Sequence, residues 1–290
     1  MNRRDMIRAS IAGTVGASTV VPVLSAGSIA TGRGLRGLDD SEQVQAAVDS
    51  GVAYFKIRCD DQMPSAKALD AAIASGDLAA AKRAYIESRP PYEEIETTAG
   101  SFEDSDTDID ARPYAFEGGE TDPNFRGFHK IENLIFAEED LEAARPYSRK
   151  LIESFATLRK ELDESERFSA EGQFGGMVAL TNEVAAKKIS SEEETWSDQT
   201  LLIFKHNWIG VHSQFKPFGA MVGNDRASVQ AVERAHRDAL ATLKPHFKPG
   251  IVAAAPYSGI SNRERRTMAD ASNRYRDAII VVRDEIGVSG

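Results

Sequence analysis

The sequence contains one cysteine, two tryptophans and fewer basic than acidic residues in a chain of 290. Because the single thiol of Cys59 cannot form an intramolecular disulfide, the fold must be stabilised by its core alone. Lys and Arg total 35 against 45 Asp and Glu, and the resulting net charge of -10 argues against a nucleic-acid partner and favours cations. No stretch alternates apolar and polar residues as a strand does, so helices are the expected elements.

The first thirty residues predict an export signal that is separate from the fold. Two arginines in "NRRDMIR" (residues 2–8) precede an uncharged, Gly- and Ala-rich stretch from Ile11 to Ala30, a pattern that resembles a twin-arginine signal peptide. Small residues at 28–30 suit a signal peptidase, so the mature chain is expected to begin near Thr31. A membrane span is the weaker alternative because Pro22 and several glycines interrupt the stretch. The signal predicts a periplasmic or cell-surface protein.

After the signal, apolar residues recur at helical spacing almost throughout. This pattern predicts an all-α helical bundle over residues 31–290, with an acidic break near 164–173 as a candidate boundary between two sub-bundles. "TDPN" (121–124) is expected to open a helix, "SSEEE" (190–194) to form a capping box, and residues 100–113 to be a polar acidic connection. The long helices are expected at 141–162, 174–188, 196–218, 228–243 and 264–286.

One expected helix carries a histidine and a glutamate three positions apart. His129 and Glu132 lie in "GFHKIENLIF" (residues 127–136), and positions i and i+3 share a helix face, so both side chains can reach one point. Helical bundles build iron and manganese sites from such pairs. From the spacing alone, a partly buried hydrogen bond with a purely structural role is the alternative.

Further acidic residues lie upstream of this pair. Glu96 closes the run "EEIE", and "DSDTDID" supplies Asp106, Asp108 and Asp110. The spacing of these aspartates approaches that of an EF-hand calcium loop, but Ala111 stands where the sharp turn requires glycine. A solvated acidic loop is the other interpretation of this run.

The sequence lacks the metal-binding motifs of known zinc peptidases. H-E-x-x-H does not occur, and the inverted form H-x-x-E-H would require a histidine where Asn133 stands. No catalytic turnover is therefore expected. The other histidines are scattered, and each is expected to be a surface or core residue with no ligand role: His206, His212, His236 and His246.

Four blocks of sequence, taken in order, resemble the imelysin-like family: "RPPYEEIETTAGSFEDSDTDIDAR", "FRGFHKIENLIF", "LTNEVAAKKISSEEETWSDQTLLIFKHN" and "YRDAIIVVRDEIGV". The resemblance implies an all-helical fold of two fused four-helix bundles. It also implies a metal site with His129 and Glu132 as ligands, Glu96 and Asp110 as additional ligands, and Glu183 as a weaker candidate. Such a mixture of imidazole and carboxylates suits iron, with zinc or another divalent cation as the alternative.

The iron-uptake members of this family act outside the cytoplasm with a membrane iron permease and a haem peroxidase. The resemblance therefore implies an exported iron-binding protein with these two partners. The chain departs from the family at Arg112-Pro113, where members often have "RE", and at "WSD" (196–198), where they have "Y-S-H". The span between Thr31 and the first helix leaves no room for the cupredoxin-like domain of longer members, so no copper site is expected. An imelysin-type metallopeptidase and a calcium- or polysaccharide-binding protein stay open as alternatives.

Overall fold

The computed structural model describes residues 42–191 and 193–289. Regular structure in this range is helical, and the one strand-type pairing described is an isolated bridge between Phe247 and Ala254. The predicted all-α class is confirmed. The signal expected at residues 1–30 lies outside the described residues. Among the described helices, none combines the length and the apolar character needed to cross a bilayer.

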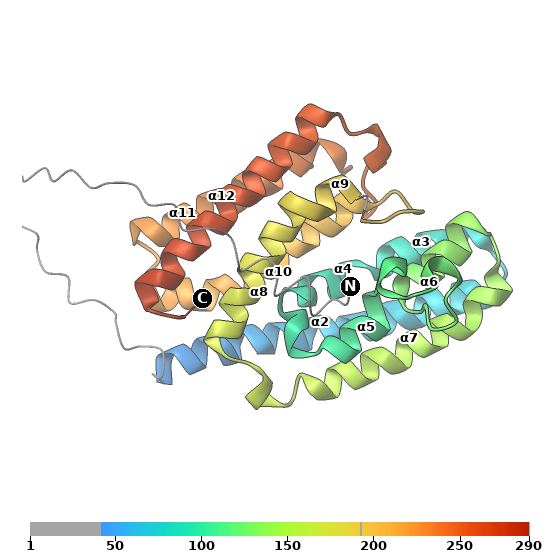
Figure 1. The fold of residues 1–290 in the computed structure, drawn as a ribbon, viewed down its shortest axis with the longest axis horizontal. Helices are drawn as coiled ribbons and strands as arrows, with labels where there is room; N and C mark the ends of the chain where they lie inside the picture. The colour runs from blue at the N-terminus through green and yellow to red at the C-terminus, as the bar shows by residue number, and fades with distance from the viewer. Residues whose placement is uncertain (1–41, 192, 290) are drawn as a thin grey trace, which may run out of the picture. The chain divides into compact units, whose positions relative to one another are not determined.

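A first group of helices packs around α2 (Glu42–Ala74), which contacts α3 (Leu78–Ser88), α4 (Pro90–Ile95) and α7 (Leu141–Glu161) (Figure 1). Two short helices, α5 (Glu103–Asp110) and α6 (Phe128–Glu132), contact α7 and each other. The inward positions of α2 recur three and four residues apart, which gives an apolar stripe along the helix. Its buried members include Val44, Val48, Phe55, Leu69 and Ile73.

The second group consists of α8 (Ala170–Glu183), α10 (Thr200–Val222), α11 (Ala227–Leu243) and α12 (Asn262–Ile286). Because α10 also contacts α2 and α4, it joins the two groups. The short elements are α9 (Ile189–Ser191), the π-helical turns at Asn133–Ala137 and Val184–Lys188, and 3-10 turns at Glu96–Ser101, Pro113–Ala115, Gly119–Thr121, Ser165–Arg167, Lys244–His246 and Tyr257–Gly259.

The close approach of α10 to α4 depends on Gly210. A Cβ atom at this position would overlap the carbonyl oxygen of Glu94, so a larger residue would push the helices apart. Trp208 and Phe215 of α10 are fully buried. The same packing brings the polar side chain of Asn207 against the glutamates of α4.

The expectation of a polar connection at residues 100–113 is wrong, because residues 103–110 form α5. Phe102, Ser105 and Ile109 are buried, and their spacing of three and four places them on one helix face. The acidic residues between them face outward or bind neighbouring side chains. Only a few apolar residues mark this helix, and the charges around them hide the pattern.

The expectation that "TDPN" opens the motif helix is also wrong. The Asp122 carboxylate accepts hydrogen bonds from the backbone N–H groups of Gly118 and Asn124, and so forms a turn. The helix begins later, at Phe128, directly after Gly127. Gly127 has φ +82°, and a Cβ atom there would overlap the carbonyl oxygen of Ile109, so glycine is required where α6 starts beside α5.

"SSEEE" does not form the expected capping box, since Glu193 and Glu194 are buried in polar contacts described below. A capping box is instead found at α12, where the Ser261 and Glu264 side chains cap each other's backbone N–H groups. Asp77 is the N-cap of α3, because its carboxylate accepts a hydrogen bond of 2.9 Å from the Ala80 N–H.

Candidate metal centre

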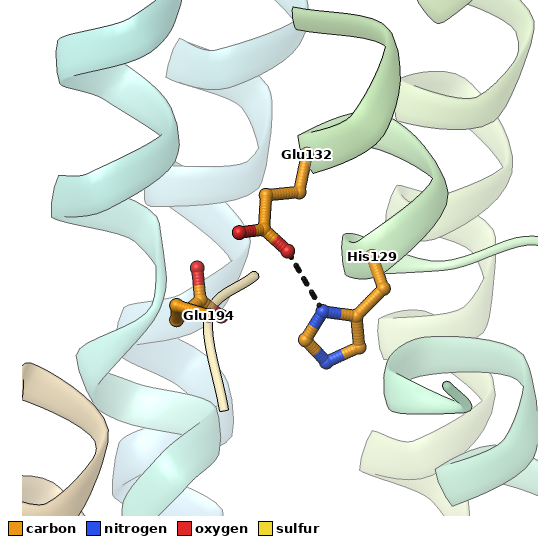
Figure 2. A group of neighbouring side chains, drawn as sticks. All are labelled: His129, Glu132 and Glu194. Atoms are coloured by element: carbon orange, nitrogen blue, oxygen red, sulfur yellow. Dashed lines mark hydrogen bonds and ion pairs between the residues drawn. The ribbon is translucent and has the colours of Figure 1, made fainter. Parts of the chain in front are cut away.

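His129 and Glu132 lie on one face of α6, as their spacing predicted, and both are buried. His129 Nδ1 and Glu132 Oε2 are 3.0 Å apart. Glu194 joins them from the segment between α9 and α10, and one ligand atom of each residue lies within 4.8 Å of the others (Figure 2). Across the described part of the chain, this triad is the one group of three or more His, Cys, Asp or Glu side chains close enough to hold a metal ion.

The Glu132 carboxylate is held in place by the backbone of the segment that carries Glu194. Its Oε1 accepts hydrogen bonds from the N–H groups of Trp196, at 2.9 Å, and Ser197, at 2.8 Å. Burial raises the pKa of Glu132, but the hydrogen bonds from His129 and from these two amides outweigh burial and lower the pKa below its ordinary value. The carboxylate is therefore ionised, with Oε2 aimed at the imidazole.

The imidazole of His129 has a carboxylate near each of its two nitrogens. Asp110 Oδ1, from the last residue of α5, lies 3.3 Å from Nε2, on the edge of the ring away from Glu132. Burial and the Arg112 charge lower the pKa of His129, but the Asp110 and Glu132 carboxylates raise it above its ordinary value. A metal ion at either ring nitrogen would take the place of the proton on that nitrogen.

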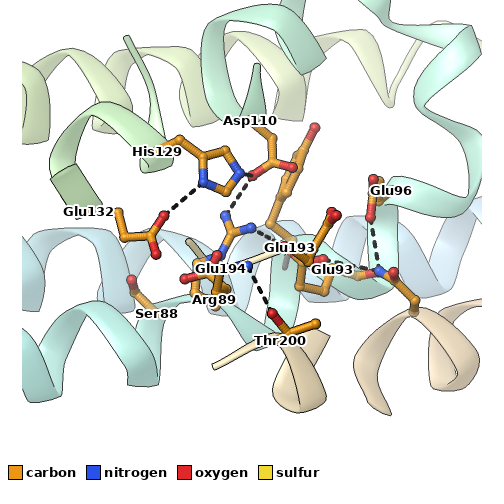
Figure 3. A network of polar contacts seen from close by, with 12 residues as sticks. Ser88, Arg89, Glu93, Glu96, Asp110, His129, Glu132, Glu193, Glu194 and Thr200 are labelled. Carbon is orange, nitrogen blue, oxygen red and sulfur yellow. Dashed lines mark hydrogen bonds and ion pairs between the residues drawn. The ribbon is translucent and has the colours of Figure 1, made fainter. Parts of the chain in front are cut away.

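Arg89, which is fully buried between α3 and α4, supplies the counter-charge of the centre (Figure 3). Burial lowers the pKa of this guanidinium, but the carboxylates around it raise the pKa well above its ordinary value, so it stays charged. The guanidinium carbon of Arg89 lies 4.3 Å from the centroid of the Phe128 ring. Its three ion pairs join Nη2 to Glu93 at 2.6 Å, Nη1 to Asp110 at 2.7 Å and Nε to Glu194 at 3.0 Å.

The pKa of Glu194 is raised toward neutral pH. Burial, followed by the nearby charge of Glu132, raises the pKa of Glu194 to about 7, against the lowering effect of Arg89. Its Oε2 accepts a hydrogen bond of 2.7 Å from the Ser197 hydroxyl, and its Oε1 accepts one of 3.3 Å from the Tyr85 hydroxyl. A cation beside this carboxylate would favour its ionised form.

Residues 59–278, more than half of the chain, match the family model described as Imelysin. The chain belongs to the Imelysin family. The iron uptake system component EfeO of Escherichia coli O1:K1 is 32% identical over 227 residues, which cover 77% of this chain and 58% of that protein. The proteins of the same name from Escherichia coli K12 and Shigella flexneri are 31% identical over 227 residues. The chain thus spans 58% of the length of these relatives.

A solved structure shares the fold of this Imelysin-family chain. It is described as an iron-regulated protein A precursor from Parabacteroides distasonis, and it aligns with a TM-score of 0.60 over 87% of this chain and 97% of its own. The sequences are 14% identical in this alignment, so the likeness shows the fold alone.

Glu96, which the resemblance to the Imelysin family implied as a ligand, lies in a neighbouring polar cluster. Its two carboxylate oxygens accept hydrogen bonds of 2.9 and 3.0 Å from the Lys188 ammonium, and Oε2 also accepts one of 2.9 Å from Asn207. The same ammonium lies 2.8 Å from Glu193, which Arg112 also contacts. Burial raises the pKa of Glu96 to about 7, although Lys188 lowers it.

Of the other two ligands that the resemblance implied, Asp110 lies beside His129 and Glu183 does not. Asp110 reaches His129, but at the ring nitrogen opposite to Glu132. Glu183 ends α8 and is partly exposed, and none of the contacts described here joins it to His129. Like Glu132, Glu183 directly precedes a π-helical turn, a feature often found at functional sites.

The calcium-loop interpretation is wrong, because Asp106, Asp108 and Asp110 lie on α5 and do not form a loop. Their side chains also have separate partners. Asp106 accepts a hydrogen bond of 2.8 Å from the Tyr92 hydroxyl, and Asp108 pairs with Arg126 at 2.6 Å. These aspartates therefore do not converge on one ion.

Glu194 and Arg89 were not among the site residues that the sequence predicted. Glu194 was predicted only as part of the cap at "SSEEE", and Arg89 entered only as the first residue of a block that resembles the family. A signal for Glu194 was present, because three consecutive glutamates lie beside "WSD" in one of the blocks that resemble the family. Nothing local to Arg89 marks it, since its three carboxylate partners come together only in the fold.

Proposed function

We propose that this chain is an extracytoplasmic iron-binding protein of an iron-uptake system, and that His129, Glu132 and Glu194 hold the ion. The observation that carries the proposal is the convergence of one imidazole and two carboxylates, all buried, on one point. This ligand set suits ferrous or ferric iron and also zinc. Iron is preferred because the relatives that match most of this chain are named as iron uptake system components.

The distances support a metal ion on the Nδ1 side of the His129 ring. Two ligand atoms about 2.1 Å from an ion and about 90° apart are about 3.0 Å from each other. The contact between His129 Nδ1 and Glu132 Oε2 measures 3.0 Å. Two ligand atoms on opposite sides of an ion would be about 4.2 Å apart. A carboxylate oxygen of Glu194 lies within 4.8 Å of the ligand atoms of His129 and Glu132, so a small shift of its side chain would let all three bind the same ion. Three protein ligands leave further positions open, as an ion that must be released again requires.

Asp110 has a different role in this arrangement. Its Oδ1 lies 3.3 Å from His129 Nε2, and a carboxylate beside the second nitrogen of a ligating histidine favours one orientation of the ring. Arg89, followed by His129, holds the pKa of Asp110 well below its ordinary value despite burial, so the carboxylate stays ionised beside the imidazole. We therefore assign Asp110 as the residue that orients His129.

The export route and the partners belong to the same proposal. The twin-arginine pattern at residues 2–8 supports a location in the periplasm or at the cell surface, and the acidic net charge of -10 suits a protein that binds cations and no nucleic acid. The resemblance to iron-uptake members of the family supports a membrane iron permease and a haem peroxidase as partners. No catalytic turnover is part of this function.

His129→Ala and Glu132→Ala are each expected to weaken binding of ferrous iron tenfold or more, on the order of 1.4 kcal/mol, because each removes one of three ligands. Calorimetry under anaerobic conditions measures the affinity, and circular dichroism checks that helicity is unchanged. His246→Ala is the matched control, since that histidine lies beside Glu264 in the second helix group. Affinities equal to wild type in both variants would leave the pair with a structural role only.

Asp110→Asn separates an orienting role from a ligand role. The asparagine keeps an oxygen that can accept from His129 Nε2, so iron affinity is expected to fall less than about tenfold. Glu132→Gln removes the charge of the proposed ligand beside His129 Nδ1, and this variant is expected to lose more iron affinity. If Asp110→Asn loses more affinity than Glu132→Gln in the same titration, the ion lies at Nε2 and our assignment of the two carboxylates is reversed.

A further inference from the structure

A second cluster of titratable side chains lies on α10, α11 and α12. The imidazoles of His212, on α10, and His236, on α11, are stacked with their centroids 3.9 Å apart and their planes at 12°. The ring of Tyr275, on α12, also packs on His236, with a centroid distance of 5.5 Å. The His236 ring therefore lies where the three helices meet. No contact among the described residues joins this cluster to the metal centre.

The two histidines differ in their polar partners. His212 Nε2 lies 3.0 Å from Glu233 Oε1, so a proton on His212 is matched by a carboxylate. His236 is 8% exposed, and its Nε2 has no hydrogen-bond partner among the described residues; the same holds for the buried Tyr275 hydroxyl oxygen. A protonated imidazole donates from both nitrogens, and a buried donor without an acceptor is costly. The closed packing therefore requires neutral His236.

The charges around His236 do not favour a proton there. His212 faces it from α10, and Tyr275 faces it from α12. On α11 itself, Glu233 is bound by His212 and Arg237 is a cation. Burial, followed by the charges of His212 and Arg237, lowers the pKa of His236 to about 3.

We propose that the stack of His212 and His236 is an acid-sensitive contact, which holds α11 and α12 on α10 at neutral pH and opens as the pH falls. In an unfolded or opened chain, histidine takes up a proton near pH 6.5, whereas closed His236 stays neutral to about pH 3. Between these values the open state binds one more proton than the closed state. The contribution to stability is complete above about pH 6.5, and below it the opening constant rises up to about tenfold per pH unit.

The test is the pH dependence of unfolding in His236→Phe. Phenylalanine keeps a flat ring for the stack but cannot be protonated. Urea unfolding of the wild-type chain at pH 7, 6 and 5 is expected to show an unfolding constant that rises more steeply with acid than in the variant, by up to about tenfold per pH unit. His246→Phe removes a histidine outside the stack and is expected to keep the wild-type slope. Equal slopes in the wild type and His236→Phe would overturn the proposal.

A measurement on the wild-type protein decides the question if the variant does not fold. The imidazole nitrogen signals of His236, followed by NMR from pH 7 to pH 5, are expected to stay those of the neutral ring while the chain is folded. Protonation of His236 anywhere between pH 7 and pH 5 in the folded chain would refute the proposal, because little or no proton would then be gained on opening.

Discussion

Replacement of Arg89 by methionine is expected to lower the free energy of unfolding by about 3–5 kcal/mol, the range found when one partner of a buried ion pair is removed. Methionine keeps most of the side-chain volume, so the loss does not come from a large cavity. The replacement of Arg89 leaves three carboxylates in the protein interior without their shared counter-charge, which is costly in a medium of low polarity. These carboxylates belong to Glu93, Asp110 and Glu194.

Urea unfolding followed by circular dichroism measures the loss, with Arg159→Met as the control. Arg159 pairs with Asp60 and Asp163 near the surface of α7, where about a third of its side chain is exposed, so its replacement is expected to cost about 1 kcal/mol or less. Arg89→Lys is expected to restore little, because an ammonium lacks the planar fork that reaches three carboxylates. A loss in Arg89→Met no larger than in the control would show that Arg89 does not neutralise the centre.

The pH dependence of this loss has a defined sign. Burial raises the pKa of Asp110, and Arg89 is the foremost charge that lowers it, to well below its ordinary value. In the wild type, the ionised Asp110 therefore stabilises the fold above about pH 3.9, and this contribution is lost as the pH falls through the lowered pKa. Without Arg89 the buried carboxylates take up protons at higher pH than in the unfolded chain. The difference between wild type and Arg89→Met should therefore shrink in acid.

The parts of the fold that the sequence predicted are those determined by local spacing. Apolar residues three and four apart predicted α7, α11 and α12 to within a few residues. The i, i+3 rule placed His129 and Glu132 on one face of α6. α5 was missed because few apolar residues, Ile109 among them, lie among many acidic ones.

The parts of the candidate site that were missed depend on segments far apart in the chain. Glu132 accepts a hydrogen bond from the Ser197 amide, 65 positions away, and the same segment brings Glu194 to the imidazole. No pattern within either segment predicts that the two segments lie in contact. The resemblance to the family pointed to Asp110, but it could not show which nitrogen of His129 the carboxylate faces, since that depends on how α5 packs beside α6.

Glu194→Gln is expected to weaken iron binding by one to two orders of magnitude, about 1.4–2.8 kcal/mol, whereas Glu193→Gln is expected to stay within about threefold of wild type. The two glutamates are neighbours in sequence, and both are buried. Glu194 lies in the triad with His129 and Glu132, while Glu193 binds Lys188 and Arg112. Glutamine keeps the shape of either side chain and removes its charge, so the comparison isolates the position of the carboxylate.

Anaerobic competition of each variant with a chelator of known affinity for ferrous iron measures the two effects, and thermal unfolding checks that both variants fold. The expected pattern is a large loss in Glu194→Gln alone, because Glu194 is the third ligand in the proposed site and lies close to His129 and Glu132. The reverse pattern would place the ion in the cluster of Glu96, Glu193 and Lys188 and would refute the triad. An equal loss in both variants would also contradict it, since a carboxylate held by two cations should contribute little to an ion bound beside its neighbour.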